Sequence, residues 1–179
     1  MNKKALIMET ALELFASAGY HETSISNIAE KAGISKGLMY NYFDSKEDLI
    51  RQIIRKGMDE LLQYFDPDQD GIITKEEIRY FIDRVFAIMS QEVDFWKIYF
   101  MVLLQPPVFK VVESEVKRPV NVFINMMKSY FETRGDEDPE MEAMIMGAIM
   151  DGLGFQLIIN PDRFPIEKVK NKLYQLYCT

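Results

Sequence analysis

Six oxygen donors lie within twelve consecutive positions, residues 66–77, and their types and spacing suit chemistry better than those of any other segment. They are, in order, the carboxylates of Asp66, Asp68 and Asp70, the backbone carbonyl of Ile72, the hydroxyl of Thr74 and the carboxylate of Glu77. Hard divalent cations bind such donors, and Ca²⁺ takes about six to eight of them, whereas Mg²⁺ keeps several waters. The spacing therefore predicts a divalent-cation site, with Ca²⁺ as the preferred ion.

The same segment satisfies the EF-hand loop pattern. Gly71 would make the sharp turn, Thr74 would act through a water, Glu77 would bind with both oxygens, and Ile73 would be the apolar residue of the loop. The alternative is an acidic turn between two helices, in which Thr74 and Glu77 only cap the second helix. EF-hands usually occur in pairs, and this sequence has no second loop of the kind. A bound ion would either stiffen the joint or act as a sensor, and the sequence does not distinguish these roles.

A second chemically distinctive segment lies nearer the start of the chain. Two short helices are expected at about residues 24–32 and 36–43, and they meet at Gly33, Ile34 and Ser35. A glycine in the turn and an apolar residue after it are typical of a helix-turn-helix, whose second helix can enter the major groove of DNA. Taken alone, the pattern also fits a helical hairpin inside a bundle.

The residues around this turn resemble the N-terminal domain of the tetracycline-repressor (TetR) family. The similar string is LELFASAGYHETSISNIAEKAGISKGLMYNYFDSKEDLI, and the resemblance covers about the first 50 residues. It implies a DNA-binding helix-turn-helix domain, placed at residues 1–56, followed by a helical regulatory and dimerisation domain at residues 57–179. In the second domain the resemblance reduces to the number and order of the helices.

The chemistry of the side chains agrees with DNA contact. The predicted DNA-binding residues are Ser24, Ser35, Lys36, Gly37, Leu38, Tyr40, Asn41, Tyr42 and Lys46. The serines and tyrosines, Lys46 and the free amides at helix starts suit phosphate contacts, and Gly37 allows a close approach. Lys36 and Asn41 are expected at guanine and adenine edges, and Leu38 at a thymine methyl group. Ile34, Met39 and Phe43 are expected in the core.

The charge of the chain is divided unevenly. The net charge is −7, yet residues 1–56 hold 8 basic and 7 acidic residues, so the acidic excess lies in the remainder. Binding to phosphates depends on local charge, and the total therefore does not exclude DNA as a partner. The nearly neutral charge of residues 1–56 predicts weak non-specific affinity for DNA.

Composition excludes several other classes of protein. One cysteine, Cys178, forms no intrachain disulfide or multi-cysteine metal site, and it fits a reducing cytoplasm. One histidine and the absence of a recognisable nucleophile–base spacing argue against an enzyme. We expect no required cofactor beyond the possible Ca²⁺, and no segment long and apolar enough to span a membrane.

Helical periodicity runs through nearly the whole sequence, which predicts an all-α fold of about nine helices. A capping box beginning at Ser45 opens a long helix to about Phe65, and another beginning at Thr74 opens a helix to about Gln91. The remaining helices are expected at residues 94–104, 109–133, 139–159 and 165–177. Breaks are expected at Pro106-Pro107 and at residues 134–138 and 160–165.

The second domain is rich in aromatic residues and methionine. Each such residue alone is most simply part of a core, but together they suit an adaptable apolar cavity. The predicted pocket residues are Phe86, Met89, Trp96, Tyr99, Phe100, Phe123, Met127 and Met150. In the TetR family such a cavity holds a small inducer. Small residues of the 139–159 helix allow close helix approach, and the resemblance places a homodimer interface at about residues 139–177.

These features predict a TetR-type transcriptional regulator, a repressor that a small apolar ligand releases from operator DNA. Two half-sites one DNA turn apart would require the dimer. The alternative function is that of a calcium-binding signalling protein whose helix-turn-helix is only structural.

Overall fold

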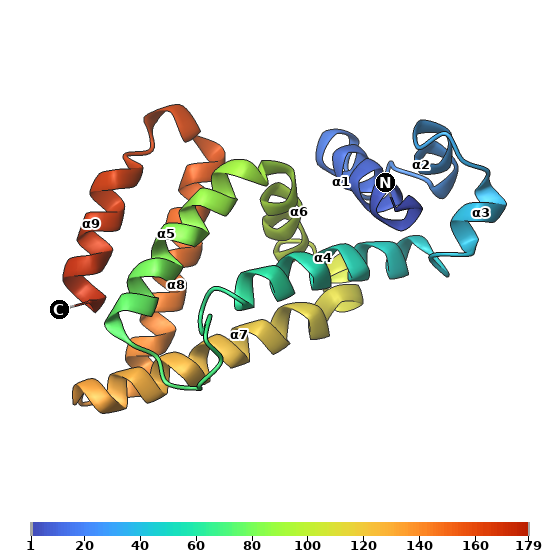
Figure 1. The fold of residues 1–179 in the computed structure, drawn as a ribbon. Coiled ribbons are helices and arrows are strands. Elements are labelled where there is room, and N and C mark those ends of the chain that lie inside the picture. Colours follow the sequence, from blue (N-terminus) through green and yellow to red (C-terminus); the bar gives the residue numbers. More distant parts are fainter. Residues whose placement is uncertain (1, 179) are drawn as a thin grey trace. The chain divides into compact units, whose positions relative to one another are not determined.

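The computed structural model describes residues 2–178 and confirms an all-α fold, with no strand among those residues. The helices are α1 (Lys3–Ala18), α2 (Ile25–Lys31), α3 (Lys36–Tyr40), α4 (Lys46–Leu62), α5 (Lys75–Gln91), α6 (Val93–Leu103), α7 (Pro106–Arg134), α8 (Pro139–Ile159) and α9 (Ile166–Tyr177), and a short 3-10 helix, η1 (Pro161–Arg163), precedes α9 (Figure 1).

Helix starts follow from side chains that accept the first free backbone N–H groups. Ser24, Ser35 and Thr74 are N-caps, and the hydroxyl of each accepts a hydrogen bond from the amide three residues later. Ser45 acts in the same way on the amide of Asp48, at 3.0 Å. The carboxylate of Asp48 accepts instead from the amide of Asp44, so only half of the predicted capping box forms there.

Three boundaries differ from the sequence-based expectation, one of them the end of α4, which lies at Leu62 rather than at about Phe65. Pro106 was expected to break the chain, but it is the first residue of α7, where a missing N–H costs nothing and the fixed φ suits a helix. Helix α3 ends at Tyr40 rather than at Phe43, and Asn41 is its C-cap.

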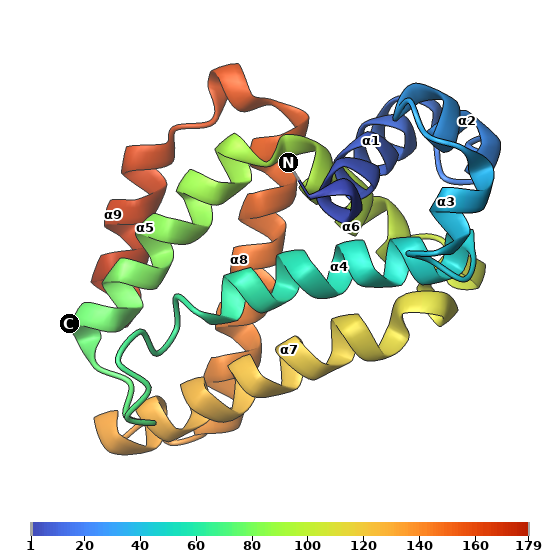
Figure 2. The same cartoon turned by 45° about the vertical axis from the view of Figure 1, so that its right-hand side comes forward.

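Packing divides the chain into two units, 1–57 with 94–115 and 58–93 with 116–179. In the first unit α2 packs against α1 and α3 over a core that includes Phe15, Ile28 and Met39. In the second unit α5 packs against α8 and α9, which lie beside it in Figures 1 and 2. These packing units are not the functional domains expected at residues 1–56 and 57–179, and that functional division stays a prediction.

Helix α8 has an apolar surface that its own chain leaves exposed. Met141, Met144, Ile145, Phe155 and Ile159 are each at least 41% exposed. Contrary to the expectation above, α8 is long and apolar enough to cross a membrane by length and composition, a test that core helices of soluble proteins also pass. An apolar surface of this kind marks a site of contact with another molecule or subunit.

Candidate nucleic-acid interface and metal loop

The helix-turn-helix is shaped by local hydrogen bonds. The Asn27 amide donates to the Ser24 hydroxyl at 3.1 Å, and the Asn27 side-chain oxygen accepts from the Ser24 amide at 3.0 Å. Gly33 adopts φ +66°, the left-handed conformation that glycine tolerates best, and the next amide, of Ile34, donates to the carbonyl of Ala29 at 3.0 Å. The turn therefore ends α2 abruptly and leads directly into the N-cap of α3.

The predicted DNA-binding residues are accessible on this motif. Ser24, Ser35, Lys36, Gly37, Tyr40 and Asn41 are exposed, and Leu38, Tyr42 and Lys46 are half-buried. Met39 and Phe43 are buried, as expected of core residues, whereas Ile34 is half-buried. Helix α3 thus keeps one side in the core and leaves the side with Lys36 and Tyr40 open to a partner.

Lys46, which is predicted to contact a phosphate, has hydrogen-bond partners within the protein. Its ammonium donates to the carbonyls of Tyr20 at 2.9 Å, Thr23 at 3.0 Å and His21 at 3.4 Å. It also lies 4.5 Å from the centre of the Tyr20 ring, within cation–π distance. These carbonyls belong to the connection between α1 and α2, so Lys46 joins the start of α4 to that connection.

Two arginines of α4 bind the first part of α7 within the same unit. Arg55 donates to the buried carboxylate of Glu115 at 2.8 Å, and Arg51 donates to the Val111 carbonyl at 3.3 Å. Burial acts to raise the pKa of Glu115, but hydrogen bonds from Arg55 and Ser114 outweigh it and hold the pKa below its usual value. Sequence reasoning missed this pair, although a glutamate beside Val108 and Val112 at helical spacing was a usable signal.

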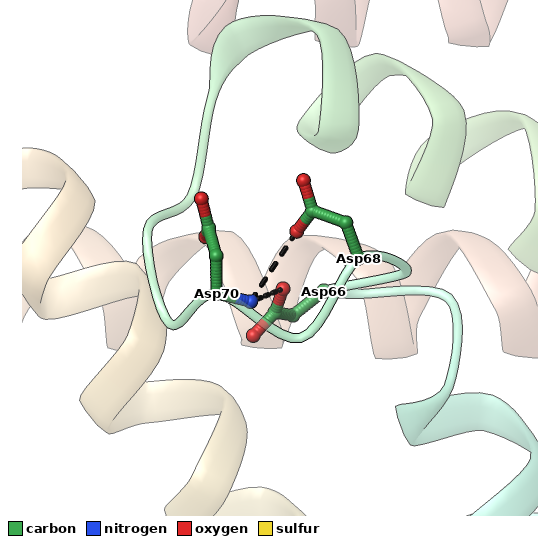
Figure 3. A group of neighbouring side chains, drawn as sticks. All are labelled: Asp66, Asp68 and Asp70. Atoms are coloured by element: carbon green, nitrogen blue, oxygen red, sulfur yellow. Dashed lines mark hydrogen bonds between the residues drawn. The ribbon is translucent and has the colours of Figure 1, made fainter.

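The acidic loop brings three of its predicted ligands together. One carboxylate oxygen each of Asp66, Asp68 and Asp70 lies within 4.8 Å of the other two (Figure 3). The carboxylate of Asp66 accepts from the amides of Asp70 at 3.2 Å and Gly71 at 3.0 Å. Gly71 adopts φ +79°, as the sharp turn requires.

The carboxylates of the loop repel one another. A hydrogen bond from the Asp70 amide lowers the pKa of the exposed Asp68, yet slight desolvation and the neighbouring carboxylates of Asp70, Asp66 and Glu77 raise it overall. A bound cation would relieve this repulsion among the carboxylates.

The other predicted ligands are arranged differently. The Glu77 carboxylate accepts from the amide of Thr74 at 2.9 Å and from its hydroxyl at 2.8 Å, which is the capping arrangement of the alternative interpretation. The side chain of Ile72, whose backbone carbonyl is the predicted ligand, is 66% exposed. The structure therefore gathers the three aspartates and leaves Glu77 engaged with the helix start.

The loop is anchored by aromatic packing on both sides. Phe65, the residue before it, stacks on Phe81 of α5 with ring centres 3.6 Å apart and contacts Phe123 of α7 at 5.0 Å. All three rings are at most 9% exposed. The residue that precedes the loop thus packs into one core with α5 and α7.

All eight predicted pocket residues are buried. In the first unit Trp96 contacts Tyr99 and Phe100 in an aromatic cluster, and its indole N–H has no partner among the described residues. In the second unit Phe86 stacks on Phe164 and Phe123 packs on Phe65. A pocket shared by all eight residues stays a prediction.

Comparison with known proteins identifies the first part of the chain. Residues 7–53 match the family described as bacterial regulatory proteins, tetR family. The fatty acid metabolism regulator protein of Bacillus subtilis is 29% identical over 85 residues, which are 47% of this chain and 44% of that protein. The chain thus matches less than half the length of this curated relative.

Solved structures match along nearly the whole chain. The fatty acid degradation regulator FadR of Bacillus halodurans superposes with a TM-score of 0.83 at 17% identity, over 99% of this chain and 95% of that one. The regulator FadR of Bacillus subtilis, solved with stearoyl-CoA, gives 0.81 at 19% identity, over 98% and 97% of the two chains. At such identities the likeness establishes the fold alone. Residues 7–53 thus match the tetR family of bacterial regulatory proteins, and the chain as a whole shares the fold of these solved regulators.

Proposed function

We propose that the protein is a DNA-binding transcriptional repressor of the bacterial cytoplasm. The observation that carries the proposal is the accessible face of α3, with Lys36, Tyr40 and Asn41 exposed beside the capped start of α2. Lysine and asparagine side chains suit base edges, and hydroxyl-capped helix starts suit phosphates. The match of residues 7–53 to the tetR family supports the same function.

The proposal includes a homodimer through residues 139–177. Helix α8 exposes Met144, Ile145 and Phe155, and α9 exposes Leu176, so both helices offer apolar surface to a second copy. A symmetric dimer presents two recognition helices to two half-sites.

A small apolar molecule is the proposed inducer, and a long-chain acyl thioester is the first candidate. The support is the relative named as a fatty acid metabolism regulator and the FadR structure solved with stearoyl-CoA. Ligand binding in the regulatory domain would move α4 and change the spacing of the two recognition helices. Trp96 is the single tryptophan and is buried in the aromatic cluster, so its fluorescence can report the binding.

Calcium is a second part of the proposal, within the regulator. The convergence of Asp66, Asp68 and Asp70 supports an ion in the loop, with the Ile72 carbonyl, Thr74 and Glu77 completing its ligands. Glu77 would then have to leave its bonds to Thr74. The alternative of a calcium-signalling protein with a structural helix-turn-helix gains no support, because the relatives named above are regulators.

Selection of bound duplexes from a random-sequence DNA library tests the proposed function. We expect enrichment of a sequence with two related half-sites, and release of the selected duplex by stearoyl-CoA but not by coenzyme A alone. Failure to enrich any sequence would contradict DNA-binding regulation. Calorimetric titration with Ca²⁺, using Asp70→Asn as the control variant, tests the ion separately, and equal heats for both proteins would exclude the loop as its site.

A further inference from the structure

Lys46 has a hydrogen-bond partner for each of its donors. A lysine ammonium carries three N–H groups, and here three carbonyl oxygens, of Tyr20, His21 and Thr23, lie 2.9 to 3.4 Å from Nζ. The side chain is half-buried and its ammonium lies beside the Tyr20 ring. A DNA phosphate could therefore bind Lys46 only by replacing one of these contacts.

The three carbonyls lie in the short connection that sets the start of α2. This connection begins at Gly19, which ends α1 with φ +90°, and it ends at Ser24, the N-cap of α2. The buried hydroxyl of Thr23 donates to the Gly19 carbonyl at 2.8 Å. Thr23 thus holds the connection from within, and Lys46 holds it from α4.

The contacts of Lys46 close the helix-turn-helix into a ring. Along the chain the ring runs from Ser24 through α2, the turn at Gly33, α3 and residues 41–45 to Lys46, whose ammonium returns to the Thr23 carbonyl. Helix α3 has only five residues, so its own hydrogen bonds do little to fix its direction. Because the segments before α2 and after α3 are joined through Lys46, the direction of α3 is restricted.

We infer that Lys46 is a positioning residue for DNA recognition, which orients α2 and α3 through the connection at residues 20–23 and does not bind phosphate itself. This inference rests on the proposed function. It assigns to Lys46 a role in specificity. If α3 changes its direction, its base contacts are lost, while the basic side chains of residues 1–56 remain near the DNA.

Salt dependence separates positioning from phosphate binding. Each phosphate neutralised by a basic side chain contributes about −0.9 to the slope of log K against log salt concentration on duplex DNA. We expect Lys46→Met to weaken binding to the selected duplex about tenfold or more, as the loss of charge-assisted hydrogen bonds implies, and to leave that slope unchanged. Binding to a random-sequence duplex of the same length should change less, so discrimination between the two duplexes falls.

Amide hydrogen exchange in the free protein tests the same contacts without DNA. Lys46→Met should accelerate exchange at residues 20–24, whereas Lys46→Arg, which keeps the charge and the donors, should restore part of the protection and part of the affinity. Lys36→Met is the matched control, since it removes the same charge from the first residue of α3 and leaves the three carbonyl contacts intact. Its exchange at residues 20–24 should equal that of the wild type.

Three results would overturn the inference. A slope reduced by about 0.9 per protomer in Lys46→Met, with unchanged exchange, would make Lys46 a phosphate ligand. If Lys46→Met, at temperatures where it is folded, binds the selected duplex and discriminates against the random-sequence duplex as the wild type does, Lys46 only stabilises the fold. Unchanged exchange in both Lys46 variants would show that the contacts do not order the connection. If the wild type binds no duplex selectively, the proposed function fails, while the exchange measurement still tests the contacts.

Discussion

Gly57 lies in the interior of α4 against the ring of Phe95 from α6. A Cβ atom added at Gly57 would overlap Cζ and Cε2 of that ring and lie 2.8 Å from Cε1, well inside ordinary van der Waals contact. The ring has little room to move, because Phe95 is 6% exposed and contacts Trp96 and Tyr99 at centre distances of 5.2 and 6.5 Å. Gly57→Ala should therefore force repacking of the aromatic cluster.

Two opposing effects set the magnitude of this change. Replacing a helix-interior glycine by alanine stabilises a helix by about 0.5–1 kcal/mol, whereas overpacking a core costs about 1–3 kcal/mol. The net expectation is a loss of about 0.5–2 kcal/mol in the free energy of unfolding. For a chain of this size the melting temperature falls by about 2–4 °C per kcal/mol.

Urea unfolding of four proteins measures the effect: the wild type, Gly57→Ala, Phe95→Leu and the double variant. Leucine lacks the ring atoms that Cβ would overlap, so Gly57→Ala should become stabilising by about 0.5–1 kcal/mol in the Phe95→Leu background. Emission from Trp96 should shift in Gly57→Ala, because the indole contacts Phe95. Stabilisation by Gly57→Ala in the wild type, with additive effects in the double variant, would refute the packing argument.

Three further changes have defined expectations. The lowered pKa of Glu115 contributes stability that is present above the unfolded pKa near 4.5 and is lost as the pH falls through the folded pKa. The urea midpoint of Glu115→Gln should therefore lack this loss in acid. Parallel pH profiles of the urea midpoint in the variant and the wild type would contradict this expectation. Tyr130→Phe removes the 2.7 Å hydrogen bond to the buried carbonyl of Tyr177 and should cost about 1–2 kcal/mol in urea unfolding, so an unchanged midpoint would show that the carbonyl finds another partner. Gly33→Ala places a Cβ at φ +66° and should cost about 1–2 kcal/mol by thermal unfolding, with Gly33→Asn less harmful; equal melting temperatures for all three proteins would rule out a strained turn.

Features encoded by neighbouring residues were predictable from the sequence. The caps at Ser24, Ser35 and Thr74 depend on a hydroxyl and an amide three residues away, and helix α8 has the expected bounds, 139–159. Gly71 and the aspartates of the loop converge through contacts between residues two to five positions apart. In each case one short segment contains both partners of the interaction.

Features that depend on distant residues were not predictable in the same way. The phosphate contact of Lys46 stays a prediction, but its carbonyl partners lie 23 to 26 residues earlier, and periodicity does not reveal them. Arg55 and Glu115 are 60 residues apart, and the ring that requires a glycine at position 57 belongs to another helix. The start of α7 at Pro106 was misjudged because a proline pair fits both a break and a first helical turn.

The first unit is discontinuous in the sequence, and this affects the protein during its synthesis. The ribosome completes residues 1–57 before residues 94–115 exist, so α4 emerges without the partners of Arg51, Arg55 and Gly57. Helices α1 to α3 contact their neighbours in sequence and can form early, because local contacts fold fast. The recognition motif should therefore appear on the nascent chain well before the unit that supports it is complete, and a fragment ending at residue 57 should be markedly less stable than the same residues in the full protein.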